Sequence, residues 1–507
     1  MSATKKRFTA AIDQGTTSTR CILFDREGVP RFSSQMEHQQ YYPKPGWVEH
    51  DADEIWKRTC SVVRDVLDQA GCTAEDLAAV GITNQRETVI PWSRSSGAPL
   101  CRGIVWQDMR GSRQIESMIS QGGIDQLRDV TGLPLSPYFA ASKMQWLIEN
   151  VPSVQQAAED GDLCLGTVDA WLIWKLTGGQ QYVTDVTNAS RYLMMDIQSL
   201  QWDRDLVSLF HLDTDYLPEI VPSMGQVIGL TSKEGPFGGE VPICGVLGDQ
   251  QAALFGQACI EVGQGKNTYG TGCFLLVNTG TRLPVSAQGL LTTPAYQIAG
   301  SAPVYALEGS IAVAGSLVQW FRDNIGLITK APEINDLASQ VEDNGGVYFV
   351  PAFSGLYAPY WDSSARGMIA GITAYVRSGH LARAVLEATA YQTKDIVDAM
   401  EKDSGVPIRE LRADGGMSQS EILMQYQADI LQVPVVRPVV NETTALGAAY
   451  AAGLTQGFWN GLEDMVLHWQ EDRRWMPAMD PAIRDREMRR WHRAVERSKS
   501  WETEDDL

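Results

Sequence analysis

Short apolar runs separated by glycine and hydroxyl residues dominate the pattern of this chain. The runs at residues 8–12 and 21–24 flank Asp13-Gln-Gly-Thr-Thr-Ser-Thr19, and this predicts a β-hairpin with a hydroxyl-rich turn. Residues 267–277, Asn-Thr-Tyr-Gly-Thr-Gly-Cys-Phe-Leu-Leu-Val, repeat this theme about halfway along the chain. The repetition indicates a duplicated architecture.

Two further segments combine a strand, a glycine turn and a helix. An apolar run at 241–247 is followed by Gly248-Asp249-Gln250 and a helical pattern over 251–256, so Asp249 is expected at a strand end and helix start. Residues 411–416 and then 417–431 give the same order, and the glycines there let the backbone approach a ligand closely.

Strands alternate with helices elsewhere too, as in the predicted strand at 367–372 and helix at 382–399. This alternation predicts an α/β protein of two related lobes. With 507 residues, two domains of about 250 residues each are expected, and we divide the chain into 1–256 and 257–507. The charged stretch from Asp480, which contains Trp491 and Trp501, is predicted to be a solvated helix and a frayed tail.

The charge balance of 42 basic and 62 acidic residues, a net charge of -20, opposes binding to nucleic acid or to an anionic membrane. A nucleotide must therefore be held by local features such as backbone amides, hydroxyls and a metal ion. The eight cysteines are scattered without a C-x-x-C pair and are predicted to be buried reduced thiols. The six histidines show no H-E-x-x-H spacing, which disfavours a histidine-based zinc site. Since the first residues lead into a β-like run and no stretch approaches 18 apolar residues, we expect a cytoplasmic protein.

The sequence contains neither a G-x-x-x-x-G-K-[ST] loop nor a strict G-x-G-x-x-G, so phosphates must be held in another way. The amides and hydroxyls of residues 13–19 could hold the β- and γ-phosphates, and Asp13 could reach Mg²⁺ directly or through water. The alternative is that this segment is a turn and nothing more.

Arg86 and Glu87 place fixed donors beside acceptors in a short apolar segment, residues 81–90. A polyol needs both, because each hydroxyl donates one hydrogen bond and accepts others, and charged partners strengthen these bonds. The alternative is a surface ion pair.

Asp249 is the candidate general base, since phosphoryl transfer to an alcohol needs a carboxylate that orients the hydroxyl and accepts its proton. The alternative, a helix N-cap, is compatible with that role. Trp106, Tyr138 and Phe274 could wall the C–H faces of a polyol, although each could equally belong to the core.

Several motifs together resemble the FGGY carbohydrate kinases, and within them the members that phosphorylate glycerol. They are Asp-Gln-Gly-Thr-Thr-Ser at 13–18, Asn-Gln-Arg-Glu-Thr at 84–88, Gly-Asp-Gln-Gln-Ala-Ala-Leu-Phe-Gly at 248–256 and Asn-Thr-Tyr-Gly-Thr-Gly-Cys-Phe at 267–274. The resemblance extends almost end to end, through the motifs at 42–51, 166–169, 187–191 and 444–450. The 84–88 motif is the one that separates glycerol-specific members from pentulose kinases.

This resemblance implies two actin-like (ribonuclease H-like) lobes with an inter-domain catalytic cleft, ATP and Mg²⁺ as cofactors, and ATP-dependent phosphorylation of glycerol to sn-glycerol 3-phosphate. It implies that Asp249 is the catalytic base, that Asp13 and Asp249 flank Mg²⁺, and that the glycerol-binding residues are Arg86, Glu87, Trp106, Tyr138, Asp249, Gln250 and Phe274. The implied nucleotide-side residues are Thr16, Thr17, Ser18, Arg20, Thr271, Gly315, Gln319, Gly416 and Ser420. Relatives further suggest a homodimer or homotetramer.

Three departures from the family pattern stand out. Ser420 occupies a position where relatives have an asparagine near the adenine, and Tyr357 occupies one where a glycine is usual. Residues 234–240, Glu-Gly-Pro-Phe-Gly-Gly-Glu, replace a basic loop that binds fructose 1,6-bisphosphate, so we expect no inhibition by that anion. Two other functions stay open: a kinase of the same family for a longer polyol or ketose, and an actin-like nucleotide switch without metabolite phosphorylation.

Overall fold

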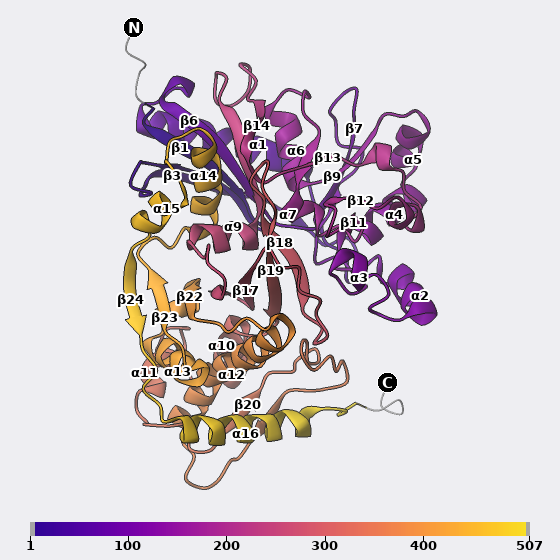
Figure 1. Cartoon of the computed structure of the whole chain (residues 1–507). Helices are drawn as coiled ribbons and strands as arrows, with labels where there is room; N and C mark the ends of the chain where they lie inside the picture. Colours follow the sequence, from indigo (N-terminus) through magenta and orange to yellow (C-terminus); the bar gives the residue numbers. More distant parts are fainter. Residues whose placement is uncertain (1–5, 503–507) are drawn as a thin grey trace.

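The computed structural model describes residues 6–502 and divides them into an upper and a lower lobe (Figure 1). The upper lobe is built mainly from the first half of the chain and the lower lobe from the second half. Helix α9 (Asp249–Gly256) lies between them, near the centre of the view. The two-lobed α/β architecture predicted from the sequence is confirmed.

A six-stranded sheet with the order β14-β15-β6-β1-β2-β3 forms the core of the upper lobe. Helices α1 (Ala52–Ala70) and α6 (Val168–Leu176) contribute to the apolar core on one face. The strands are β1 (Phe8–Gln14), β2 (Ser18–Phe24), β3 (Pro30–Glu37), β6 (Leu77–Asn84), β14 (Met224–Leu230) and β15 (Pro242–Gly248).

Helix α14 (Thr443–Thr455) comes from the second half of the chain but packs with α9 on the other face of this sheet. A Cβ atom at Gly81 of β6 would lie 2.1 Å from the carbonyl oxygen of Ala448. The glycine therefore lets the α14 backbone pack directly on the strand. The chain thus returns to its first lobe after building the second, and the division into 1–256 and 257–507 stays a prediction.

The upper lobe carries a second, smaller layer to the right in Figure 1. A five-stranded sheet, β4-β5-β8-β7-β9, packs there with helices α4 and α5. Its strands are β4 (Gln40–Tyr41), β5 (Glu49–His50), β7 (Val89–Ser93), β8 (Gly103–Ile104) and β9 (Leu163–Thr167). The neighbouring helices are α2 (Ser112–Gly122), α3 (Arg128–Thr131), α4 (Ala140–Asn150), α5 (Pro152–Glu159), α7 (Val186–Ala189) and α8 (Arg204–Leu209).

Two short strand pairs complete the upper lobe. They are β10 (Val183–Asp185) with β13 (Glu219–Val221), which run parallel, and β11 (Met195–Asp196) with β12 (Gln201–Trp202), which run antiparallel.

The lower lobe is built on a seven-stranded sheet with the order β18-β19-β17-β16-β22-β23-β24. The strands are β16 (Gln264–Tyr269), β17 (Cys273–Gly280), β18 (Leu291–Tyr296), β19 (Val304–Ile311), β22 (Glu410–Asp414), β23 (Val435–Pro438) and β24 (Glu471–Trp475). The other elements are α10 (Gly315–Trp320), α11 (Glu333–Ala338), α12 (Ser378–Ser404), α13 (Glu421–Leu431), β20 (Tyr348–Val350), β21 (Met368–Ala370) and α16 (Pro481–Ser498). Helix α15 (Leu462–His468) instead packs with α14 in the core of the upper lobe.

Both predicted hairpins are confirmed: β1 pairs with β2 and β16 with β17, each antiparallel. The predicted strand at 241–247 is β15, and α9 begins directly after it at Asp249. The helix predicted over 417–431 begins later, at Glu421, because Gly416–Gln419 form a 3-10 turn first. The segments predicted at 367–372 and 382–399 correspond to β21 and to part of α12.

The predicted C-terminal helix is present as α16, but it is solvated on one face only and buries the other. Helix α16 runs along the bottom of the lower lobe, and Trp491 is 1% exposed within the core (Figure 1). Its indole ring stacks on Tyr391 with 5.1 Å between ring centroids. The backbone stays attached as far as Glu502, whose N–H donates to the Ser364 carbonyl, while residues 503–507 of the predicted tail lie outside the described part. The amphipathic spacing of Trp491 and Val495 outweighs the high overall charge of this helix.

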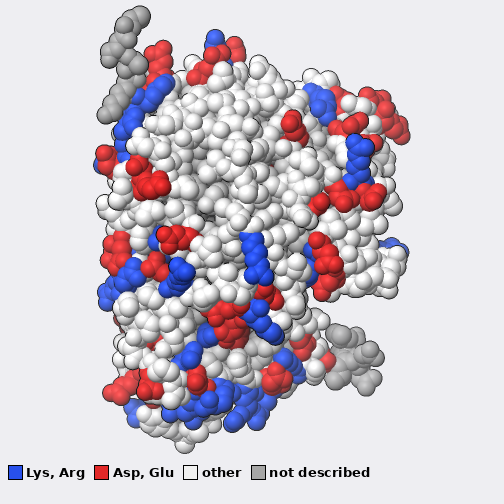
Figure 2. Space-filling model, in the orientation of Figure 1, with Lys and Arg blue, Asp and Glu red and all other residues white. Residues whose placement is uncertain are grey.

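Five of the eight cysteines are buried as predicted, but Cys60, Cys72 and Cys101 are partly exposed. Among residues 6–502, no helix is both long enough and apolar enough to cross a membrane. On the face drawn in Figure 2, basic side chains lie among acidic ones.

Candidate active site at the junction of the lobes

The turn between β6 and β7 holds Arg86 and Glu87 away from solvent. Their residues are 3% and 1% exposed, and Glu87 has a left-handed backbone with φ 58°. Such a φ turns neighbouring side chains in different directions and is uncommon outside glycine. Burial rules out the surface ion pair considered from the sequence, and each residue has its own partner elsewhere in the chain.

Arg86 forms a bidentate pair with Glu308 of β19. Its Nη1 and Nη2 atoms lie 2.7 and 2.8 Å from the two carboxylate oxygens. The Nε atom lies 3.2 Å from Oδ1 of Asp249. Burial acts to raise the pKa of Glu308, but Arg191 and Arg86 outweigh it and lower that pKa to about 2. One guanidinium therefore connects the upper lobe, the start of α9 and the lower sheet.

Glu87 pairs with Arg191, whose Nε lies 2.5 Å from Oε1. Burial raises the pKa of Glu87, although Arg191 and Arg86 oppose the shift. The Nη1 atom of Arg191 is also 3.4 Å from Glu308, so the four charged groups form a connected chain of ion pairs from Glu87 to Arg86. Sequence reasoning did not assign Arg191 or Glu308 to the site. Arg191 stood in the recognised 187–191 motif, whereas Glu308 gave no local signal because it lies 222 residues from Arg86.

Asp249 is the first residue of α9, directly after β15. The N-cap position belongs to Gly248, and no side-chain cap bond is formed there. The Asp249 carboxylate accepts instead from the Gln250 N–H at 2.7 Å and faces Arg86, with 32% of its side chain exposed. The carboxylate is thus held on one side and accessible on the other.

Gln250, the other residue predicted at this position, accepts through Oε1 from the Nζ of Lys266. Its side chain therefore already has a partner in the lower sheet.

The aromatic residues Trp106, Tyr138 and Phe274 are all partly exposed. Trp106 and Tyr138 meet edge to face with ring centroids 5.5 Å apart, and Arg191 lies 5.5 Å from the Tyr138 ring. Phe274 stands on β17 opposite Ser310 of β19, two residues from Glu308. Because residues two apart in a strand share a face, Phe274 lies on the same side of the lower sheet as Glu308.

The turn between β1 and β2 is joined to this group by Trp106, whose Nε1–H donates to Thr16 Oγ1 at 3.0 Å. Thr17 is exposed, whereas Ser18 is buried and its hydroxyl accepts from Gln35. The structure therefore brings Thr16 and Thr17 to the open side of the turn and directs the Ser18 hydroxyl toward β3.

Asp13 lies at the end of β1, cross-strand from Arg20. The Nε of Arg20 is 3.6 Å from Asp13 Oδ2, and its Nη1 pairs with Glu442. Burial raises the pKa of Asp13 to about 6, Arg20 opposes this shift, and the negative charges of Asp249 and Glu442 add to it. Asp13 and Asp249 are therefore close enough to influence each other electrostatically.

The second hairpin turn and α10 form a mostly exposed surface. The Thr271 carbonyl accepts from the N–H groups of Ala314 and Ser316 at 3.1 and 3.0 Å, and the Gly315 N–H donates to Gly270. The side chains of Thr271 and Gln319 are exposed, as is Gly416 at the start of its 3-10 turn. Backbone hydrogen bonds, with few side-chain contacts, hold this region together.

Ser420, like Ser18, is buried and is 6% exposed. Its hydroxyl accepts from the Leu423 N–H as the N-cap of α13 and donates to Asn335. The serine that stands here in place of the family's asparagine therefore acts as the N-cap of α13.

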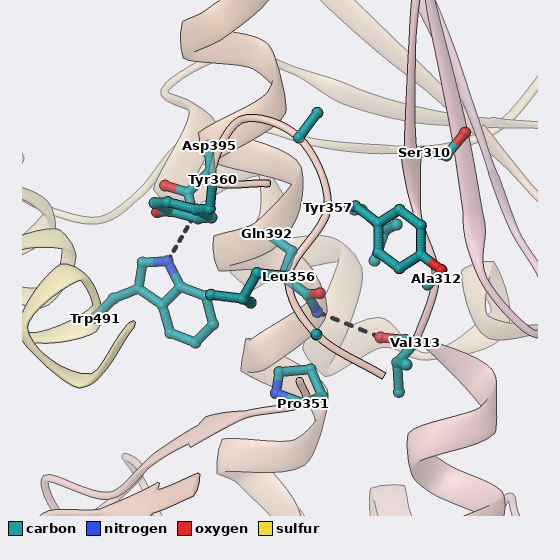
Figure 3. Close-up of a pocket in the computed structure, with 13 residues that line it drawn as sticks. Ser310, Ala312, Val313, Pro351, Leu356, Tyr357, Tyr360, Gln392, Asp395 and Trp491 are labelled. Carbon is teal, nitrogen blue, oxygen red and sulfur yellow. Dashed lines mark hydrogen bonds between the residues drawn. The ribbon is translucent and has the colours of Figure 1, made fainter. Parts of the chain in front are cut away.

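Tyr357 lies in the loop after β20, with 46% of its surface exposed. Figure 3 shows its ring directed toward Ala312, in the segment that leads into α10. The same loop is fastened by Tyr360, which donates to Asp395 at 2.8 Å, as does the Nε1–H of Trp491 at 2.7 Å. The cavity between them, about 30 Å³, has room for no more than one or two water molecules. Tyr357 therefore covers a small gap beside the nucleotide-side surface.

The loop at residues 234–240 connects β14 to β15. Glu240 pairs with Lys233 at 3.4 Å, and both side chains are more than half exposed. One carboxylate thus already neutralises the lysine of this segment.

Comparisons with known proteins agree with this geometry. Residues 8–256 match the N-terminal domain of the FGGY family of carbohydrate kinases, and residues 265–455 match its C-terminal domain. The chain is 56% identical to a glycerol kinase of Methylobacterium radiotolerans over 503 residues, which cover 99% of this chain and 100% of the relative. It is 55% identical to a glycerol kinase of Chloroflexus aurantiacus, covering 98% of this chain and 99% of the relative.

Among solved structures, the chain resembles Plasmodium falciparum glycerol kinase with ADP, with a TM-score of 0.93 and 39% identity, over 97% of this chain and 98% of the other. A xylulose kinase from Lactobacillus acidophilus, 22% identical, shares the fold with a TM-score of 0.86 over 97% of each chain. Both halves of the chain, its two-lobed fold and its near full-length relatives lead to one conclusion. The chain belongs to the FGGY family of carbohydrate kinases.

Proposed function

We propose that the protein transfers the γ-phosphoryl group of ATP to glycerol, giving sn-glycerol 3-phosphate and ADP, the first step of glycerol catabolism. The arrangement of Arg86, Glu87 and Asp249 at the junction of the lobes carries this proposal. Full-length relatives at 54–56% identity that are named glycerol kinases support it.

Glycerol is uncharged, so it must be recognised by the direction of its hydroxyl groups. Arg86 and Glu87 offer charged donors and acceptors that are fixed before the substrate arrives, because Glu308 and Arg191 already hold them. We assign Tyr138 and Gln250 to further hydroxyl contacts and Trp106 and Phe274 to the carbon skeleton. This set of residues favours a short triol over a longer acceptor.

Asp249 is assigned as the general base. Its Oδ1 atom faces Arg86 and the Gln250 N–H, which leaves Oδ2 to accept the proton of the attacking hydroxyl. The new bond joins the glycerol oxygen to the γ-phosphorus as the bond from phosphorus to the β,γ-bridging oxygen of ATP breaks, and that oxygen leaves with ADP.

We assign the phosphates to Thr16, Thr17, Ser18, Arg20 and Thr271, and the rest of the nucleotide to the surface formed by Gly315, Gln319, Gly416 and Ser420. Residues 1–256 would then form the lobe that binds glycerol and phosphate, and residues 257–507 the lobe that binds the nucleotide.

Asp13 and Asp249 would hold Mg²⁺ between them. Hard carboxylate oxygens suit this ion. Burial is the main cause that raises the pKa of Asp13 to about 6, the charges of Asp249 and Glu442 add to the shift, and a bound cation would favour the ionised carboxylate. When bound, Mg²⁺ neutralises part of the phosphate charge. We further propose a cytoplasmic homodimer or homotetramer.

The test is ADP release with Mg-ATP against glycerol, erythritol, xylulose, ribulose and no acceptor, with identification of the product. Glycerol-dependent release with sn-glycerol 3-phosphate as product is expected. Preference for a longer acceptor would support a kinase of this family but contradict a pocket specific for a triol. Turnover indifferent to every acceptor would favour a nucleotide switch.

A further inference from the structure

Lys266 is a fully buried ammonium group beside the candidate active site. It lies on β16 and is 0% exposed. Its Nζ atom donates to Gln250 Oε1 at 2.5 Å and to Thr268 Oγ1 at 3.1 Å. Among the described residues it has no carboxylate oxygen within 4 Å, so its direct partners are uncharged. Burying an ammonium group has a high free-energy cost, and only one amide oxygen and one hydroxyl offset it here.

The register of the lower sheet places Lys266 in the same row as Glu308. Lys266 stands opposite Leu276 of β17, and Leu276 stands opposite Glu308 of β19. The two charged residues are therefore two strands apart, roughly 10 Å, and point to the same face of the sheet. Glu308 holds Arg86, which faces Asp249, while Lys266 holds Gln250, the next residue of α9.

The contact with Lys266 decides which way the Gln250 amide faces. An ammonium group has donors and no acceptor, so the amide must present its oxygen to Lys266. The amide NH₂ is then directed away from the lysine. The start of α9 thereby offers one acceptor, Asp249, and one donor, Gln250, to a hydroxyl-bearing ligand.

Burial lowers the pKa of Lys266, whereas the charges of Asp414, Asp249 and Glu308 act against this shift. None of these carboxylates forms an ion pair with Lys266 within the described part of the chain. Their negative charges favour the ionised form of Lys266, whereas its hydrogen bonds are made to neutral groups.

We propose that Lys266 is a positioning residue for the acceptor substrate, acting through Gln250 by fixing the orientation of its amide. The inference rests on the proposed function, since it assumes that Gln250 donates to a glycerol hydroxyl. It adds a residue of the lower sheet to a site whose other charged contacts are made by the upper lobe and Glu308.

A double-mutant cycle with Lys266→Met and Gln250→Leu tests whether Lys266 acts through Gln250. Each single variant is expected to raise the glycerol KM roughly tenfold, the effect of losing one oriented hydrogen bond, with the ATP KM unchanged. The double variant should resemble the Gln250→Leu variant, because the two residues form one unit. Multiplied effects, near a hundredfold, would instead indicate independent structural roles and overturn the proposal.

Gln250→Glu separates positioning from folding. A carboxylate keeps a partner for Lys266, so the melting temperature should be retained, but it removes the NH₂ donor, so the glycerol KM should again rise roughly tenfold. Unchanged glycerol binding in this variant would overturn the proposal even if Lys266→Met does not fold.

Arg412→Met is the matched control. Arg412 is the next member of the same row, on β22, is 7% exposed, and donates to the carbonyl of Gln257, beyond the end of α9. Its loss should change the glycerol KM by less than about twofold, because it does not reach Gln250. An equal rise in the glycerol KM of Arg412→Met would show that loss of any cation from this row of the sheet disturbs the site. Failure of the proposed function is distinguishable, since the wild-type protein would then show no glycerol-dependent ADP release.

Discussion

The glycerol side and the nucleotide side of the candidate site are built in different ways. On the proposed glycerol side, Arg86, Glu87, Arg191 and Glu308 are at most 3% exposed and form a connected chain of ion pairs. On the nucleotide side, Thr17, Thr271, Gln319 and Gly416 are exposed, and backbone hydrogen bonds define the turns.

The difference follows from what each ligand would bring. A small uncharged triol supplies no charge, so its site must hold oriented charges in advance, at the cost of burying them. A nucleotide brings its own phosphates, and backbone amides in a turn are sufficient partners for them. The glycerol side should therefore be sensitive to single charge changes and the nucleotide side to backbone geometry.

Asp249→Asn should give the largest effect. The change removes the proton acceptor with little change in volume, so kcat should fall by roughly 10²- to 10⁴-fold while ATP affinity stays within about threefold. Steady-state kinetics and nucleotide titration measure both. Asp398→Asn, which alters an exposed helical carboxylate paired with Lys394, is the control and should be silent. A variant at 249 that kept most of its turnover would show that another group is the base.

Glu308→Gln should strongly destabilise the fold. It leaves Arg86 and Arg191 buried with one carboxylate fewer, and breaking such a pair costs about 3–5 kcal/mol. Glu442→Gln on the nucleotide side removes a pair whose side chains are 29% and 43% exposed, which costs less than about 1 kcal/mol. Denaturant midpoints of the two variants compare the two sides directly, and equal losses would contradict the distinction drawn between them.

The stabilisation by Glu308 should also depend on pH. Its pKa falls from 4.5 to about 2 in the folded state, so the folded form binds the proton more weakly than the unfolded chain. The contribution is complete above pH 4.5 and is lost as the pH falls through about 2. The difference in unfolding midpoint between wild type and Glu308→Gln should be constant from pH 7 to about 5 and narrow below that. A difference that stayed constant down to pH 2.5 would argue against an ionised Glu308.

Gly315→Ala should affect the nucleotide side selectively. A Cβ atom there would lie 2.5 Å from the Gly270 carbonyl oxygen, so the turn must shift at a cost of about 1–3 kcal/mol. The ATP KM should rise about tenfold with the glycerol KM unchanged. Gly416→Ala tests the same surface without a backbone clash, because its Cβ would meet no protein atom within 4 Å, so its melting temperature should be unchanged. If both variants behaved alike, backbone fit would not explain the effect.

Fructose 1,6-bisphosphate should have no effect on activity. The loop that would meet it carries Glu234 and Glu240, which repel an anion, and the carboxylate of Glu240 already pairs with Lys233. An activity titration at constant ionic strength, with inorganic phosphate as the comparison ligand, measures this. Inhibition by millimolar or lower concentrations of the bisphosphate would contradict this prediction and would show a binding surface outside both sides of the site.

Local patterns in the sequence predicted the elements that carry the site. The two hairpins, the strand before Asp249 and the helix after it were expected from apolar runs and glycines, because hydrophobic periodicity and turn chemistry act over a few residues. The same local reasoning missed the buried face of α16, because the high overall charge of this helix outweighed the apolar spacing that includes Trp491. It also placed the start of α13 too early, since the 3-10 turn before Ser420 looks helical in sequence.

The sequence by itself determined which residue types were available: Arg86 beside Glu87, Asp249 after a strand, and hydroxyl-rich turns at two places. Tertiary structure alone decided their partners. Glu308 and Arg191 hold Arg86 and Glu87 from positions 222 and 104 residues away, and Lys266 holds Gln250 across the junction of the lobes. No local pattern encodes such pairs. They form only when the two sheets and α9 pack together, which brings residues from distant strands into contact and excludes water between them.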